Sequence, residues 1–352
     1  MQAPTDATPV PERAPAPSTI NHQPSTTRAP ARGLVMLSGG LDSQLAVCVL
    51  RGQGCHVEGV VFDSPFFNIQ AAHAASRNLS VPLQVIDFTA DISELVAHPP
   101  HGFGGAMNPC IDCHARMIRR AGERMRELGW DFVATGEVLN QRPMSQNRRA
   151  LDLVARESGF ADCLIRPLSA QLLEPTRPEL DGRVDRSRLL KLSGRSRHDQ
   201  TALAAQYGLR DYPTPAGGCL LTERQFCRKL QDLKDHEGLG NPFDLARLRL
   251  GRHFRLPGGA KCIVGRNAVE NQQLARQCRP DETLIRPLAV PGPTVILSAG
   301  ASAPDLAQAL GLAAGYCDAG LETVRLRCAG SGGLREVSVA RLPRETARPW
   351  LL

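Results

Sequence analysis

A short apolar run, Gly33–Leu37, leads directly into the segment Ser38-Gly39-Gly40-Leu41-Asp42-Ser43, and a helix-like stretch from Gln44 to Leu50 follows. This order predicts a β-strand that opens into a helix through a turn of glycine and hydroxyl residues. Such a turn lets several backbone N–H groups converge on an anion, and the positive end of the helix adds to the attraction. The segment therefore predicts a phosphate site in an α/β protein.

The residue types of this turn refine the prediction. Ser38 and Ser43 supply hydroxyl donors, while Gly39 and Gly40 let the backbone approach a pyrophosphate closely. Asp42 would repel bare phosphate, so we expect it to cap the helix or to bind Mg²⁺. The Walker pattern Gly-x-x-x-x-Gly-Lys-Ser/Thr does not occur here. An ordinary strand-to-helix connection is the alternative.

Ser-Gly-Gly-x-Asp-Ser resembles the PP-loop of the ATP pyrophosphatases, which cleave ATP between its α and β phosphates and leave a substrate adenylated. The resemblance implies that the pyrophosphate is held by Ser38, Gly39, Gly40, Leu41, Asp42 and Ser43. A PP-loop alone does not name the substrate.

Length and composition bound the remaining possibilities. The chain has 352 residues with 42% apolar content, enough for two or three domains with ordinary cores. It shows neither a stretch of 18 apolar residues nor a signal-peptide pattern, so we expect a cytoplasmic protein without a membrane partner. Its 42 Lys and Arg against 35 Asp and Glu suit a polyanionic partner such as RNA. An arginine-rich proteome would produce the same surplus.

Composition changes along the chain predict four segments. Residues 1–31 are rich in Pro, Ala, Ser and Thr, which predicts a disordered tail. Apolar runs alternate with helical stretches over 32–170, which predicts a doubly wound, mostly parallel sheet with helices on both faces. The resemblance implies that this sheet is of the PP-loop type. Residues 171–237 are basic and helical, and a Gly/Pro-rich break at Gly238–Pro242 opens a smaller α+β domain over 238–352. The expected strands are 33–37, 57–62, 83–88, 132–135, 164–168, 252–254, 261–264 and 294–298.

Three cysteines narrow the chemistry. Cys110 and Cys113 precede an amphipathic helix with a basic outer face, predicted over 113–129, and Cys219 follows a distant glycine-rich turn, 215–218. A thiolate at a helix start has a lowered pKa. The three thiols could hold a [4Fe–4S] cluster with one open iron, or carry a persulfide that is resolved as a disulfide. A zinc site completed by His114 or His198, or no function, also remains open.

Four motifs occur in the order seen in tRNA thiouridine synthases, and the chain resembles the 2-thiouridylases over residues 33–235. They are Ser38–Ser43, Asn-Pro-Cys-Ile-Asp-Cys-His at 108–114, Val-Ala-Thr-Gly at 133–136 and Ala-Gly-Gly-Cys-Leu-Leu at 216–221. The resemblance implies ATP-dependent adenylation of a tRNA uridine carbonyl and its replacement by sulfur. It also implies Cys113 and Cys219 as the sulfur-handling pair, Cys110 as a third thiol, and Gly136 in the nucleotide site.

The implied cofactors are ATP, Mg²⁺ and, on one of the open alternatives, the [4Fe–4S] cluster. The implied partners are tRNA and a sulfur donor, which is a cysteine desulfurase, a persulfide carrier or sulfide. Basic residues expected to contact RNA are Arg148, Arg149, Arg195, Arg197 and Arg266.

Two features depart from the 2-thiouridylase pattern. Glu137 stands where that family has histidine, and its usual C-terminal β-barrel is not recognisable. Instead, the segments 265–271 and 291–297 are similar to the RNA-binding domain of NFACT-type proteins. Three rival functions stay open: 4-thiouridine synthesis, an amide-forming PP-loop ligase, and a non-catalytic RNA-binding protein that senses nucleotide.

Overall fold

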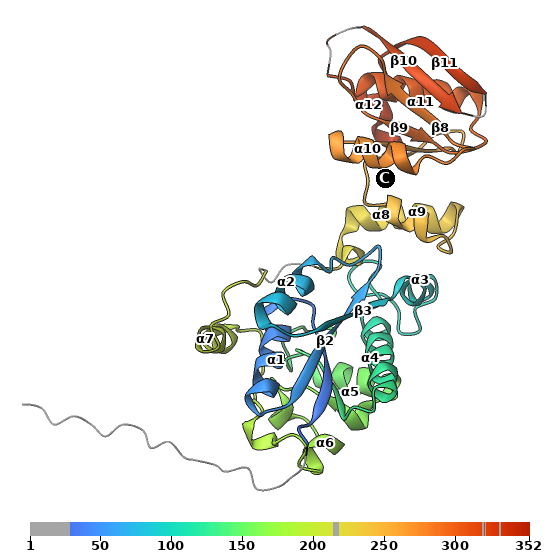
Figure 1. Cartoon of the computed structure of the whole chain (residues 1–352). Coiled ribbons are helices and arrows are strands. Elements are labelled where there is room, and N and C mark those ends of the chain that lie inside the picture. Colours follow the sequence, from blue (N-terminus) through green and yellow to red (C-terminus); the bar gives the residue numbers. More distant parts are fainter. Residues whose placement is uncertain (1–28, 214–217, 319, 321, 331) are drawn as a thin grey trace, which may run out of the picture.

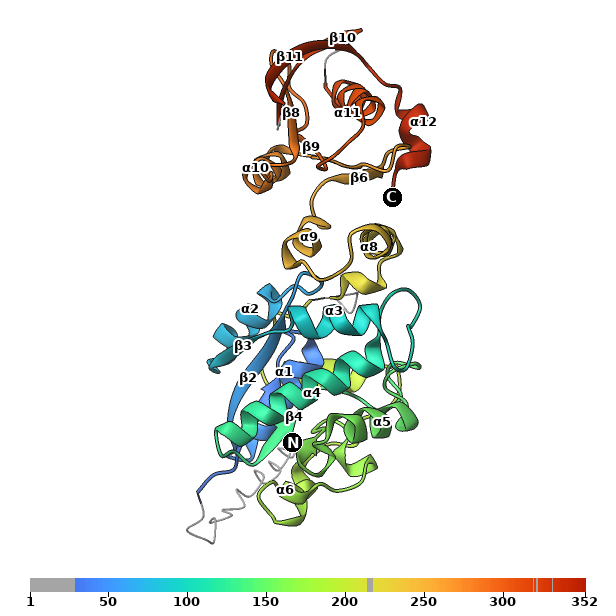
Figure 2. The same cartoon turned by 90° about the vertical axis from the view of Figure 1, so that its right-hand side faces the viewer.

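The structure, a computed structural model, describes residues 29–352 except 214–217, 319, 321 and 331. It consists of an α/β domain and a C-terminal domain, with helices α8 (Arg224–His236) and α9 (Pro242–Arg247) between them (Figures 1 and 2). The expected tail lies almost wholly outside the described residues, and so does most of the glycine-rich turn before Cys219. No helix in the described part of the chain has the length and apolar character needed to cross a membrane.

The first domain is built on a five-stranded parallel sheet in the order β3-β2-β1-β4-β5, as the strand pattern predicted. The strands are β1 (Arg32–Met36), β2 (His56–Asp63), β3 (Leu83–Asp87), β4 (Phe132–Ala134) and β5 (Leu164–Ile165). The strand order reverses at β1, which pairs with β2 on one side and with β4 on the other. Open α/β sheets form their ligand crevice at this switch point, beyond the carboxyl ends of the strands.

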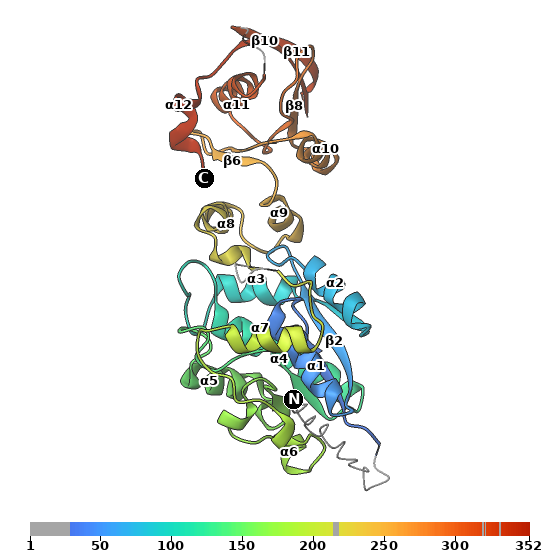
Figure 3. The same ribbon diagram turned by 90° about the vertical axis from the view of Figure 1, so that its left-hand side faces the viewer.

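Helices cover both faces of this sheet (Figure 3). They are α1 (Leu41–Gly52), α2 (Gln70–Leu79), α3 (Thr89–Ala97), α4 (Cys110–Glu127), α5 (Arg148–Ser158), α6 (Arg177–Leu180) and α7 (His198–Gln206). Leu34 and Val35 are both fully buried, because consecutive residues of a strand point to opposite faces. Val35 packs in a core with α1 and α7, whereas Leu34 packs in a core with α3, α4 and α5. The sheet is thus buried on both sides.

The C-terminal domain contains a six-stranded antiparallel sheet in the order β11-β10-β8-β9-β7-β6. Its strands are β6 (Arg252–Arg255), β7 (Lys261–Val264), β8 (Thr283–Pro287), β9 (Val295–Leu297), β10 (Thr323–Gly330) and β11 (Gly333–Ala340). Helix α11 (Ala303–Gly315) covers one face, and α10 (Ala268–Gln277) places Leu274 on the other, beside Ile263 and Ile296. The chain ends with α12 (Arg344–Ala347), and the short 3-10 helices are η1 (Ala161–Cys163), η2 (Ala170–Leu172), η3 (Arg186–Arg188), η4 (Leu220–Thr222) and η5 (Arg348–Trp350).

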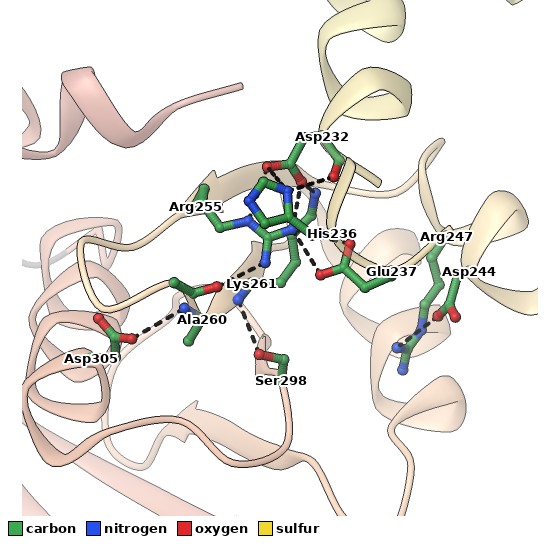
Figure 4. A network of polar contacts seen from close by, with 11 residues as sticks. Asp232, His236, Glu237, Asp244, Arg247, Arg255, Ala260, Lys261, Ser298 and Asp305 are labelled. Carbon is green, nitrogen blue, oxygen red and sulfur yellow. Dashed lines mark hydrogen bonds and ion pairs between the residues drawn. The ribbon is translucent and has the colours of Figure 1, made fainter. Parts of the chain in front are cut away.

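Helices α8 and α9 pack against the first domain, and α8 also contacts the second domain. Phe226 and Leu230 of α8 and Leu245 of α9 pack into the core of the first domain. On the other side of α8, Asp232 accepts hydrogen bonds from Arg255 at 2.9 and 2.8 Å and from Lys261 (Figure 4). Both helices therefore belong to the first core, and the core of the second domain begins at β6, beyond the break expected at residue 238.

The junction also fixes the charge state of Asp232. Burial raises the pKa of this carboxyl, but the hydrogen bonds and charges of Arg255 and Lys261 outweigh burial and hold the pKa below its usual value. Asp232 is therefore a carboxylate shared by two cations of the second domain.

Candidate active site

The phosphate loop lies between β1 and α1, and its shape requires glycine. Gly39 has φ +85°, and a Cβ atom there would lie 2.2 Å from the carbonyl carbon of Ala71 in α2. Gly40 is the N-cap of α1, and no side chain caps the helix at this residue. The amide groups of the first turn are therefore available to an anion, which the positive end of the helix attracts.

Side chains of the same segment hold the loop in shape. Ser43 Oγ donates to the carbonyl oxygen of Gly40 at 2.8 Å and lies 3.3 Å from Ser38 Oγ. Gln44 Nε2 donates to the carbonyl oxygen of Gly39 at 2.8 Å. These internal hydrogen bonds preorganise the loop.

Asp42 lies in the first turn of α1 with one oxygen engaged and one without a partner. Gln141 Nε2 donates to Oδ2 at 3.1 Å, and Arg197 Nη2 lies 3.8 Å from the same oxygen. Among the described residues, Oδ1 is buried without a hydrogen-bond partner. Burial raises the pKa of this carboxyl against the opposing effects of Gln141 and Arg197. A buried, orphaned carboxylate oxygen beside an anion site is a fitting ligand for Mg²⁺.

Gly136 brings the end of β4 into backbone contact with this loop. A Cβ atom at Gly136 would lie 2.6 Å from both the carbonyl carbon of Asp42 and the amide nitrogen of Ser43. No larger residue fits at this position unless α1 moves. Gly136 thus shapes the loop from the neighbouring strand.

The three thiols come from two distant segments. Cys110 and Cys113 lie in the first turn of α4. Cys219 forms an isolated antiparallel bridge with Phe67, which follows β2, and the amide of Leu220 donates to the carbonyl oxygen of Phe66 at 3.0 Å. The pKa of Cys113 is raised, first by burial and then by the neighbouring Cys219 and Cys110 thiols. The structure therefore brings the three sulfur atoms within electrostatic reach of one another.

The expectation of a lowered thiol pKa at the start of α4 was wrong for Cys113. Burial raises the pKa of Cys113 well above its usual value and that of Cys219 to about 11. Loss of hydration disfavours a buried thiolate more than the helix dipole favours it. Both groups are thiols in this arrangement.

The donors do not fit a metal ion as they are placed. In the described part of the chain, no group of three or more His, Cys, Asp or Glu side chains is arranged to hold one. His114 is bonded to Glu137, and His198 is exposed beside Asp199. Asn108 Nδ2 donates to Cys110 Sγ at 3.1 Å. In the described part of the chain, the cysteines therefore do not fit an iron–sulfur cluster or zinc.

Glu137 is the centre of a buried polar network. Its Oε2 accepts from Arg166 Nε at 2.8 Å and from Thr135 Oγ1 at 3.1 Å, and its Oε1 lies 3.1 Å from His114 Nδ1. Although burial raises its pKa, the charge of Arg166 and the contacts of His114 hold the pKa well below its usual value. Glu137 therefore ties the first turn of α4 to the ends of β4 and β5. Sequence analysis missed Arg166, whose only signal is a cation directly after a buried strand.

The arginines expected to contact RNA lie in different places. Arg148 and Arg149 are exposed at the start of α5, where they line an open hollow, and Arg195 is exposed. Arg197 approaches Asp42 of the phosphate loop, and Arg266 of the second domain is paired with Glu270 at 2.5 Å. Arg148 and Arg149 form the exposed pair of this set.

The expected basic outer face of α4 is largely engaged with neighbouring elements. Arg116 pairs with Asp91 of α3 at 2.9 Å, Arg124 Nε donates to Gln84 of β3 at 2.9 Å, and Arg119 Nη2 donates to the carbonyl oxygen of Glu157 in α5. These side chains connect α4 to α3, β3 and α5, so their contacts stabilise the fold.

Comparison with known families follows the same division into domains. Residues 29–171 match the family model described as Thiamine biosynthesis protein (ThiI). The first domain is similar to that family. Residues 251–351, beginning at β6, match the family described as NFACT protein RNA binding domain. The first domain and the second domain thus match separate families.

Curated relatives of this chain include proteins named tRNA-specific 2-thiouridylase. The one from Xanthobacter autotrophicus is 26% identical over 64% of this chain and 60% of its own length. The one from Chloroflexus aurantiacus is 28% identical over 64% of this chain and 66% of its own length. The chain spans about three fifths of the length of the curated relatives it matches. A solved 4-thiouridine synthetase–RNA complex with bound ATP is 21% identical, with a TM-score of 0.34, over 51% of this chain and 52% of that one.

Proposed function

We propose that this chain is a PP-loop protein and acts in the cytoplasm as an ATP-dependent tRNA sulfurtransferase of the 2-thiouridylase type. It adenylates a uridine carbonyl oxygen and replaces that oxygen with sulfur. The observation that carries the proposal is the placement of a preorganised phosphate loop and three thiols at one edge of the same sheet.

The topology explains why these groups share an edge. The phosphate loop follows β1, and Phe67, the bridge partner of Cys219, follows β2. Helix α4 precedes β4 and returns across the sheet, so its N-terminal turn with Cys110 and Cys113 starts at the carboxyl edge of the strands. A substrate bound in the crevice at this edge would meet both sets of groups.

The first step activates the base. The uridine carbonyl oxygen attacks the α-phosphorus of ATP, the bond from that phosphorus to the bridging oxygen breaks, and pyrophosphate leaves. The amide groups of the loop and the hydroxyls of Ser38 and Ser43 stabilise the leaving pyrophosphate. Mg²⁺, held by Asp42, would neutralise phosphate charge. The ring carbon then carries AMP, which is a good leaving group.

The second step delivers sulfur through the cysteine pair. The terminal sulfur of a persulfide on Cys113 or Cys219, loaded by the sulfur donor, attacks the ring carbon, and AMP leaves. The other thiol of the pair then attacks the inner sulfur, which forms a Cys113–Cys219 disulfide and releases the thiocarbonyl. A dithiol reductant returns both cysteines to thiols.

Serine variants test this division of labour. Cys113→Ser and Cys219→Ser are expected to abolish thiouridine formation while tRNA-dependent pyrophosphate release persists. Cys328→Ser, in β10 of the second domain, is the matched control and should leave both activities unchanged. Full thiouridine formation by either active-site variant would refute the proposal. The pyrophosphate assay with ATP, Mg²⁺ and bulk tRNA also separates this enzyme from a nucleotide-sensing RNA-binding protein.

The choice of carbonyl is tested separately. The relatives of this chain that bear the name 2-thiouridylase favour C2 over C4. Mass spectrometry of tRNA nucleosides from a strain lacking the protein should show loss of a 2-thiouridine. Loss of 4-thiouridine would move the reaction to C4, and unchanged nucleosides would favour an amide-forming ligase. Iron analysis after anaerobic purification checks that the cysteines hold no cluster: active, iron-free protein is expected, and iron that is required for activity would contradict the persulfide route.

A further inference from the structure

We infer that the open hollow between the loop before α4 and the start of α5 binds backbone phosphates of the RNA beside the target nucleotide. This inference rests on the proposed function, because it names the residues that bind the tRNA substrate. The hollow is lined by His101, Arg148, Arg149, Asp152, Leu153 and Arg156.

The charge of the hollow favours a polyanion. Three guanidinium groups, those of Arg148, Arg149 and Arg156, face one carboxylate, Asp152. Arg148 and Arg149 also begin α5, where the positive end of the helix adds to their field. Guanidinium groups bind phosphate oxygens through two parallel hydrogen bonds.

These arginines differ from those of α4 in having no structural task. Arg148 and Arg149 are exposed, and neither forms an ion pair with a carboxylate among the described residues. Within the described ranges, Arg156 has one ion pair, a surface contact with its neighbour Glu157 at 3.5 Å. By contrast, Arg116 of α4 bridges two carboxylates of α3. An exposed arginine pair without a packing role is available to a ligand.

The wall opposite α5 is anchored to the turn that carries the thiols. His101 Nδ1 lies 2.6 Å from Asp112 Oδ1, and the backbone amide of His101 donates to Asp112 Oδ2 at 3.1 Å. Asp112 is buried and stands between Cys110 and Cys113 in the sequence. A phosphate held in the hollow is therefore positioned by the same turn that positions two of the thiols.

An aromatic residue on the same loop points to RNA instead of a small anion. Phe103, two residues after His101, is 39% exposed, and Lys234 Nζ of α8 lies 6.0 Å from the centre of its ring. Unpaired nucleotides are recognised by aromatic stacking together with basic contacts to the backbone. The loop supplies the ring, and α5 supplies the cations.

Salt dependence of RNA binding tests the inference. The slope of log affinity against log salt is expected to shrink by about 0.7 for each phosphate contact removed from a single strand. Arg148→Ala/Arg149→Ala should therefore reduce the slope by about 1.4. The double Lys variant, which keeps both charges, should restore it. Arg77→Ala, an exposed arginine at the last turn of α2, is the matched control and should bind as the native protein does.

Kinetics and cross-linking distinguish this inference from the proposed function. The double Ala variant should raise the KM for tRNA and leave the KM for ATP unchanged, and photo-cross-links of native protein to tRNA should map to 98–109 and 148–156. A native slope in the double Ala variant would overturn the inference while thiouridine formation stands. Reduced slope and mapped cross-links in a protein that forms no thiouridine would support the surface and refute the reaction.

Discussion

Glu137 shows how one residue change alters a neighbourhood. It stands where the resembled family has histidine, and the structure gives its carboxylate two basic partners, Arg166 and His114. A histidine at this position would place an imidazole beside the buried guanidinium of Arg166, which is 7% exposed. Acidic residue and cation therefore form a matched pair in this chain.

Replacing Glu137 should destabilise the protein even when the new residue is the family's own. Glu137→Gln and Glu137→His leave Arg166 buried without a counter-charge. Loss of one partner of a buried ion pair lowers the unfolding free energy by about 4 kcal/mol. Urea unfolding measures this loss. Glu123→Gln on the exposed side of α4 is the control, with an expected change below about 1 kcal/mol. Native stability in Glu137→His would contradict the assigned role.

The close approach of Gly136 to the phosphate loop predicts that a side chain at this position is not tolerated. In Gly136→Ala the new methyl group would press on the backbone of Asp42 and Ser43, so we expect a loss of about 1–3 kcal/mol and a strong fall in pyrophosphate release. Gly240→Ala is the control, because a Cβ there meets nothing within 4 Å. Equal effects of the two substitutions on pyrophosphate release would show that Gly136 does not shape the loop.

The burial of Cys219 predicts its reactivity. Its pKa is about 11, so the thiolate fraction, and with it the alkylation rate, should rise through about pH 11 in the folded protein. In urea the same thiol should titrate near its ordinary value of about 8.5. Iodoacetamide labelling followed by peptide mass spectrometry measures both profiles. Coincident profiles would mean that Cys219 is solvated in the native protein.

Among the helices and strands, α4 shows that the spacing of apolar residues predicts a helix but not the partners of its polar side chains. The spacing of its apolar residues correctly predicted an amphipathic helix, and the strand pattern correctly predicted the first sheet. The partners of its arginines were not predictable, because Asp91 and Gln84 lie on elements that pack against α4 only in the folded chain. For the same reason, the Glu137–Arg166 pair, 29 residues apart, escaped sequence analysis.

The two kinds of arginine should respond differently to substitution. Arg116→Ala removes contacts with Asp91 and Glu94 and should lower the unfolding free energy by about 1 kcal/mol. Its RNA affinity should keep the native salt slope, unlike that of the α5 double variant. Thermal unfolding and filter binding measure the two properties. A reduced slope in Arg116→Ala would place RNA on α4 as well.

The contacts of Asp232 in α8 with Arg255 and Lys261 hold the second domain against the first. The lowered pKa of Asp232 means that its contribution to stability is present above the unfolded value, about 3.9, and is lost as the pH falls through the lower folded value. Asp232→Asn should loosen the joint at neutral pH, seen as faster limited proteolysis between the domains. Asp235→Asn, exposed on the next turn of α8, is the control. Native proteolysis rates in Asp232→Asn would exclude this role.

The contacts between α8 and the second domain also bear on whether the second domain can be exchanged for another. Helix α8 begins just after Cys219 and η4, and it ends near the carboxylate that Arg255 and Lys261 share. A gene fusion that exchanged the second domain for a module without cations at these places would leave Asp232 with only His236 of its own helix, at 3.7 Å, as a basic neighbour. We therefore expect a substitution of Asp232 to be accompanied by substitutions of Arg255 and Lys261 in relatives that keep both domains.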